Sequence, residues 1–145
     1  VADDSALVRE MLRDLMEKAG FTVEVVSNGR AAWERLEDIK RRCEEDGQPI
    51  SDFVHVVVSD IEMPVMDGLN LTHRIKTDHV LSKLPVILFS SLITDKLRHK
   101  GDSVGADDKI SKPEVTQLAR RAMVLIKARE EEAAAGGNHM AGRAV

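Results

Sequence analysis

Residues 56–68 read VVVSDIEMPVMDG, and the expected fold is organised around this stretch. The valines that open it form an apolar, β-branched run, which is typical of a strand buried on both faces of a parallel sheet. The run ends at Ser59 and Asp60, where the strand would meet its loop, and open α/β sheets bind ligands at such carboxyl ends. Pro64 and the Asp-Gly pair that closes the stretch predict a shaped turn. Asp60 is therefore the candidate nucleophile.

The composition is that of an ordinary globular domain. The chain has 145 residues, of which 43% are hydrophobic and 32% charged, enough for one domain with a sizeable core. A net charge of −4, with acids and bases interspersed, argues against nucleic acid as a partner. Because no apolar run approaches a membrane span and no signal peptide is recognisable, we expect a cytoplasmic protein without membrane insertion.

Predicted helices and strands alternate along the chain. Ser5 is a typical helix N-cap, Gly20 is typical of a helix end, and Asn28-Gly29 predicts a turn into the next helix. Apolar runs predict strands at five places, each followed by a helix: residues 1–2, 21–26, 54–58, 86–89 and 109–111. This alternation predicts an α/β fold built on a parallel, doubly wound sheet.

Side chains of complementary chemistry follow four of these strands. Asp3 and Asp4 follow the first, Asp60 the third, Ser90 the fourth and Lys112 the fifth, and such strand ends share one edge of a parallel sheet. Three carboxylates in one pocket repel one another unless a cation neutralises them, and a small all-oxygen set suits Mg²⁺. The hydroxyl and the ammonium group could hold a phosphoryl group on Asp60. Singly, each residue also fits an ordinary role as a cap, turn former or solvated charge; together they predict phosphoryl transfer.

The acid pair at residues 3–4, Asp60 with its MPVMDG loop, Ser90 and the Lys-Pro pair at residues 112–113 resemble the receiver domain of two-component response regulators. The resemblance implies a flavodoxin-like, five-stranded parallel sheet of order 2-1-3-4-5 with five helices. It also implies that Asp60 accepts a phosphoryl group from a phosphohistidine of a histidine kinase. Such a protein is not a conventional enzyme, because it catalyses only its own phosphorylation and dephosphorylation.

The resemblance further implies how Mg²⁺ would be held. Asp4 and Asp60 would ligate the ion directly, Asp3 would act largely through water, and the backbone carbonyl of Glu62 would supply a further ligand. Glu62 lies two residues after the nucleophile. We expect its side chain to crowd the phosphoryl group or to orient the water that attacks it.

By the same resemblance, Ser90 and Lys112 hold phosphoryl oxygens, and the peptide bond between Lys112 and Pro113 is cis. One position departs from the family pattern. Three residues before the lysine of the site, the family usually has a tyrosine or phenylalanine that swings inward on phosphorylation. This chain has Lys109 there and contains no tyrosine. We therefore expect the signal to reach the face formed by the fourth helix, fifth strand and fifth helix by another route.

A narrower resemblance involves three segments, SDIEMPVMDG, FSSL and VGADDKISKPE. They are similar to the receiver half of CheV-type chemotaxis coupling proteins, which fuse a CheW-like scaffold domain to a receiver. This resemblance implies a histidine kinase of the chemotaxis type as partner and a CheW-like domain in the full-length protein.

The expected organisation is a receiver domain at residues 1–130, a flexible tail or linker at residues 131–140, and a separate segment at residues 141–145. The first strand is short, because only two apolar residues precede Asp3. Residues 141–145 read AGRAV and would complete this strand if placed ahead of Val1, by permutation, by numbering or by insertion into a neighbouring chain. Insertion into a neighbouring chain would make a strand-swapped or homodimeric contact; an unrelated tail is the alternative.

Two other functions compete with a phosphorylatable receiver. Some magnesium-dependent phosphatases also use an aspartyl nucleophile with a hydroxyl residue, a lysine and further acids. Their nucleophile follows the first strand, however, and a second aspartate lies two residues on, where this chain has Glu62. The other alternative is a degenerate receiver that acts only as a binding module, against which the intact set of site residues argues.

Overall fold

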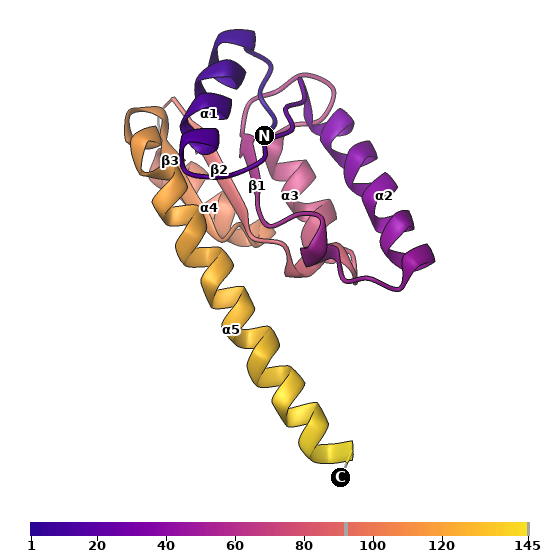
Figure 1. The fold of residues 1–145 in the computed structure, drawn as a ribbon. Helices are drawn as coiled ribbons and strands as arrows, with labels where there is room; N and C mark the ends of the chain where they lie inside the picture. Colours follow the sequence, from indigo (N-terminus) through magenta and orange to yellow (C-terminus); the bar gives the residue numbers. More distant parts are fainter. Residues whose placement is uncertain (92, 145) are drawn as a thin grey trace.

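A parallel sheet forms the centre of the computed structural model, which describes residues 1–91 and 93–144, with side chains through residue 134 (Figure 1). The strands β1 (Val57–Asp60), β2 (Val86–Ser90) and β3 (Asp108–Ser111) pair in the order β1-β2-β3. Every residue of β1 and β2 is buried, as expected of strands covered on both faces. The apolar runs therefore predicted these two strands correctly.

The first two predicted strands are reduced to single bridges. Ala2 bridges Val26 on one side and Ser59 of β1 on the other, both in parallel orientation. The Asp60 N–H donates to the Ala2 carbonyl at 2.9 Å. Residues 21–26 are otherwise outside any strand. Over the described residues the sheet has three strands, so the five-stranded order 2-1-3-4-5 is not confirmed.

Helices cover both faces of the sheet (Figure 1). They are α1 (Ala6–Lys18), α2 (Gly29–Asp46), α3 (Gly68–Thr77), α4 (Asp95–Val104) and α5 (Leu118–Ala144). Short 3₁₀ helices lie at η1 (Ile50–Asp52), η2 (Leu81–Lys83) and η3 (Lys112–Gln117). The predicted N-cap at Ser5 is confirmed, since its side chain accepts from the Val8 N–H. The Asn28 side chain caps α2 by accepting from the Ala31 N–H.

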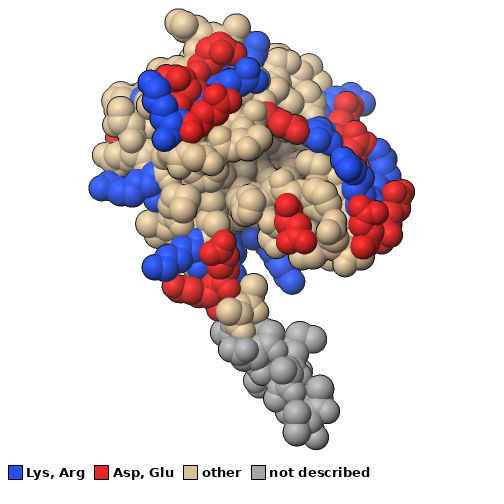
Figure 2. Space-filling view, in the orientation of Figure 1, with Lys and Arg blue, Asp and Glu red and all other residues tan. Residues whose placement is uncertain are grey.

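Two apolar clusters divide the core between the faces of the sheet. One joins α2 and α3 to β1 and β2 through residues such as Ile39, Leu71, Ile75 and Leu88. The other joins α1 and α5 to all three strands through residues such as Leu12, Phe89, Ile110 and Leu118. Acidic and basic side chains lie interspersed on the face shown in Figure 2, as the sequence predicted.

The last helix extends into the segment predicted as a tail or linker, and the predicted division of the chain stays a prediction. α5 continues through residues 131–140, where a tail or linker was expected, and ends at Ala144. The run of glutamates and alanines after residue 129 explains this, because both residue types favour helix. The hypothesis for residues 141–145 includes Val145, which lies outside the described residues, and it stays a prediction. Among the described residues, no helix has the length and apolar character needed to cross a membrane.

The predicted cis peptide between Lys112 and Pro113 is wrong, because the described residues contain no cis peptide bond. Pro113 lies in the first turn of η3, which begins with a capping box between Ser111 and Glu114. The fixed backbone angle of proline suits the first turn of a helix, where its missing N–H is not needed.

Candidate functional site

The carboxyl ends of the three strands bring the predicted site residues to one edge of the sheet. Asp60 is the last residue of β1, Ser90 is the last residue of β2, and Lys112 directly follows β3. The register pairs Ser90 with Ser111, which places Lys112 next to the end of β2. A cleft of about 680 Å³ opens at this edge, lined by Asp4, Asp60, Ile61, Glu62, Met63, Pro64, Asp67, Ser90, Ser91 and Lys112.

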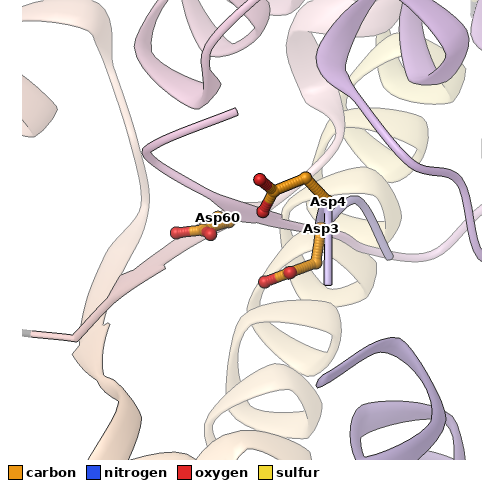
Figure 3. A group of neighbouring side chains, drawn as sticks. All are labelled: Asp3, Asp4 and Asp60. Atoms are coloured by element: carbon orange, nitrogen blue, oxygen red, sulfur yellow. The ribbon is translucent and has the colours of Figure 1, made fainter. Parts of the chain in front are cut away.

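Three aspartates converge beneath this cleft (Figure 3). One carboxylate oxygen from each of Asp3, Asp4 and Asp60 lies within 4.8 Å of the other two. Asp3 is fully buried and Asp60 is 5% exposed, whereas Asp4 is exposed to solvent. The first carboxylate oxygen of Asp3 accepts from the Ser5 N–H at 2.7 Å, and its second, Oδ2, has no hydrogen-bond partner among the described residues. A buried oxygen without a partner, next to two further carboxylates, fits the oxygen ligand set that Mg²⁺ prefers.

Lys112 supplies the positive charge of the site. Its Nζ atom lies 3.7 Å from Oδ2 of Asp60 and 3.9 Å from Oδ2 of Asp3. These distances are too long for hydrogen bonds, so the ammonium group balances charge while remaining able to move closer to a ligand. Lys112 also lies over the ring of Phe89, 5.8 Å from its centroid. One ammonium against three carboxylates leaves the site negative, which favours a bound cation.

The Asp60 carboxyl group titrates in this negative, buried environment. The pKa of Asp60 is raised to about 6, mainly by burial and also by the neighbouring Asp3 carboxylate, while Lys112 opposes both effects. Near neutral pH the group is therefore mostly ionised, but at an energetic cost. A divalent cation would remove that cost by favouring the ionised form.

The loop after β1 is held in a defined shape. The Gly68 N–H donates to the Ile61 carbonyl at 2.8 Å, and the Asp67 side chain caps α3 by accepting from the Asn70 N–H at 2.7 Å. A side chain at Gly68 would not fit, since its Cβ would lie 2.1 Å from the Asp60 carbonyl oxygen. Val65 has φ of 69°, an uncommon conformation for a β-branched residue. The shaped turn predicted from the sequence is therefore present, with local backbone strain at Val65.

The structure brings all the predicted site residues together: Asp3, Asp4, Asp60, Glu62, Ser90 and Lys112. The roles predicted for Glu62, as a carbonyl ligand and as a side chain near the phosphoryl group, stay predictions. Sequence reasoning missed Ser91 and Asp67, which also line the cleft, and Phe89, which lies beneath Lys112. All three are sequence neighbours of predicted site residues or members of the same loop, which is the signal that could have found them.

Comparison with known proteins decides the family. Residues 1–123 match the family model of the response regulator receiver domain. The chain belongs to this family. Within it, the chain is 29% identical to the solved signal receiver domain of a signal transduction histidine kinase from Syntrophus aciditrophicus. That structure has a TM-score of 0.70, and the match covers 88% of this chain and 87% of that one. The prediction of a receiver domain is confirmed.

Curated relatives of this receiver domain are varied. The protein-glutamate methylesterase/protein-glutamine glutaminase 1 of Syntrophomonas wolfei is 39% identical over 115 residues, which cover 78% of this chain and 29% of that protein. The transcriptional regulatory protein SphR of Synechococcus elongatus is 29% identical over 92% of this chain and 50% of that protein. The chemotaxis protein CheV3 of Helicobacter pylori is 27% identical over 72% of this chain and 32% of that protein. The chain therefore spans half or less of these relatives, and CheV3 is one similar protein among regulators of several kinds.

Proposed function

We propose that this receiver domain accepts a phosphoryl group on Asp60 from a histidine kinase of the chemotaxis type, and that phosphorylation changes its partner binding. The observation that carries the proposal is the surroundings of Asp60. Its carboxylate stands at the end of β1, lines the open cleft, and lies close to two other aspartates and the Lys112 ammonium group. Phosphoryl transfer depends on positioning and on charge stabilisation, and this arrangement supplies both.

In the proposed reaction, an Asp60 carboxylate oxygen forms a bond to phosphorus as the phosphorus–nitrogen bond of the phosphohistidine breaks. The imidazole nitrogen leaves with the electron pair and takes a proton from solvent. The Nζ atom of Lys112, which lies 3.7 Å from Oδ2 of Asp60, moves into contact with a phosphoryl oxygen. The Ser90 hydroxyl, which lines the same cleft, donates a hydrogen bond to another phosphoryl oxygen. Asp3, Asp4 and Asp60 would hold Mg²⁺ together with the Glu62 carbonyl, and the bound ion would neutralise charge on the carboxylates and the phosphoryl oxygens.

We propose that the same residues also promote hydrolysis of the acyl phosphate on Asp60. The domain would then end its own phosphorylated state and would act on no other substrate. Glu62 is exposed and lines the cleft, and we propose that its side chain crowds the phosphoryl group or orients the attacking water. We propose a chemotaxis role, a cytoplasmic location and a CheW-like domain in the full-length protein. Support comes from the similarity to CheV3 and from the sequence segments shared with CheV-type proteins.

The proposal is tested by incubating the protein with acetyl phosphate, with and without Mg²⁺, and measuring intact mass. We expect one phosphoryl group per chain, dependent on Mg²⁺, and none on the Asp60→Asn variant. Equal labelling of the parent and of this variant would overturn the proposal. Continuous turnover of a small phosphate ester would favour the phosphatase alternative instead.

A further inference from the structure

Lys109, the residue that departs from the family pattern, lies beneath α4. It pairs with Leu88 in the sheet, and its side chain is only 11% exposed. The preceding residue, Asp108, points to the opposite face, where it forms an ion pair with Arg121 of α5. The alternation of side chains along a strand therefore directs the Lys109 stem to the face that carries α3 and α4.

The main chain of α4 rests directly on this stem. A Cβ atom at Gly101 would lie 2.7 Å from Cδ of Lys109 and 3.2 Å from its Cγ. Only glycine allows this approach without displacement of the lysine. Glycine is otherwise a poor residue for the interior of a helix, so the close contact with Lys109 explains its presence in α4.

The end of the lysine side chain reaches the next residue of α4. The Nζ atom of Lys109 forms an ion pair with the Asp102 carboxylate. Asp102 lies in the last turn of α4, where a negative charge is unfavourable for the helix dipole. Hydrogen bonding to Lys109 holds the pKa of Asp102 below its ordinary value. Gly101 and Asp102 are therefore both unfavourable for the stability of the isolated helix, but each makes a favourable contact with Lys109.

Other contacts hold α4 only loosely. Within α4, all of whose residues the structure describes, Gly101 is the one buried residue. Leu97 and Val104 are half-buried, and the remaining residues are exposed. By comparison, α2 buries five residues and α3 four. A helix with so little buried surface opens more easily than the rest of the fold. The contact with Lys109 therefore contributes a large part of the interactions that hold α4 against the sheet.

We propose that the Lys109–Asp102 ion pair is a latch that holds α4 against β3, and that phosphorylation of Asp60 releases it. The second half of this inference rests on the proposed function. Lys112 lies three residues after Lys109 and is within 4 Å of the Asp60 carboxylate without a hydrogen bond to it. Drawing Lys112 onto a phosphoryl oxygen displaces the end of β3, and with it the lysine stem on which α4 rests.

The latch is tested by hydrogen exchange of the α4 amides in the unphosphorylated protein. Lys109→Met keeps the stem and removes the charge, and Asp102→Asn removes the other partner. We expect exchange in α4 to be about two- to fivefold faster in each variant, the range for a partly exposed ion pair, and no faster in the double variant than in either single one. Lys100→Met, which removes an exposed charge from the same helix, is the control and should exchange at the parent rate. Parent-like exchange in both latch variants would overturn the proposal.

The release step is tested with the parent labelled by acetyl phosphate, with the extent of labelling measured by intact mass in the same samples. Labelled parent should exchange in α4 as fast as unlabelled Lys109→Met, and labelling of Lys109→Met should add nothing further. Full labelling with parent-like exchange in α4 would overturn release by phosphorylation. Failure of labelling would overturn the proposed function, while the comparison of unlabelled variants would still decide whether the latch exists.

Discussion

Replacing Asp60 with asparagine should stabilise the domain at about pH 8 and have little effect at about pH 4. Burial, reinforced by the Asp3 carboxylate and opposed by Lys112, raises the pKa of Asp60 to about 6 from an ordinary 3.8. The folded state therefore binds this proton more tightly than the unfolded chain. As the pH rises from 3.8 to above about 6, ionisation of Asp60 lowers the free energy of unfolding. A difference of about 2 in pKa corresponds to ~3 kcal/mol, fully developed above the folded pKa.

Urea denaturation of the parent and of Asp60→Asn at the two pH values measures this effect directly. Comparing the variant with the parent cancels the titration of carboxylates that do not interact with Asp60. Glu62→Gln is the matched control, because it removes a negative charge from the same cleft at an exposed position and should leave the pH dependence unchanged. Mg²⁺ should restore stability to the parent at the higher pH and have little effect on Asp60→Asn.

Two results would refute this reasoning. Equal stabilisation by Asp60→Asn at both pH values would show that the gain does not come from ionisation of a strained carboxylate. Destabilisation at the higher pH would show that the Asp60 charge is favourable in the fold, so that Lys112 outweighs burial and Asp3.

Further predictions concern the site and its support. Lys112→Met should slow labelling by acetyl phosphate by ~10²-fold, the usual cost of losing one charge-stabilising donor, whereas Lys109→Met should label at the parent rate; equal rates for both variants would remove Lys112 from the reaction. Glu62→Gln should change the rate at which labelled protein loses its phosphoryl group, measured after removal of acetyl phosphate, and an unchanged rate would discard its role in hydrolysis. Gly68→Ala should cost ~3 kcal/mol in urea denaturation, because the added Cβ would lie 2.1 Å from the Asp60 carbonyl oxygen; a cost below ~0.5 kcal/mol would show that the loop moves aside freely.

The candidate site could be predicted from the sequence because the topology of a parallel sheet largely determines which residues lie together. Apolar runs located β1 and β2, and a parallel sheet brings the residues after its strands to one edge. Asp60, Ser90 and Lys112 could thus be placed together from their chemistry and their order in the chain. The start of α1 was similarly predictable from Ser5, whose side chain caps the helix locally.

Features that depend on tertiary contacts could not be predicted in this way. The full burial of Asp3 and its unpartnered oxygen depend on how α1 packs over the sheet. Residues 21–26 pair with the rest of the sheet only through the bridge between Val26 and Ala2, and the sequence pattern does not show how far such pairing extends. The path of Lys109 beneath α4 depends on the missing side chain at Gly101, which the sequence alone does not connect with position 109.

The central claim is that Asp60 is the group that receives the phosphoryl group. The most direct measurement is to label the protein with acetyl phosphate and Mg²⁺ and to map the modified residue by mass spectrometry of proteolytic fragments. We expect one label, on Asp60, which hydroxylamine removes as it does from acyl phosphates. A label mapped to Ser90 or to a histidine, with Asp60 unmodified, would contradict it.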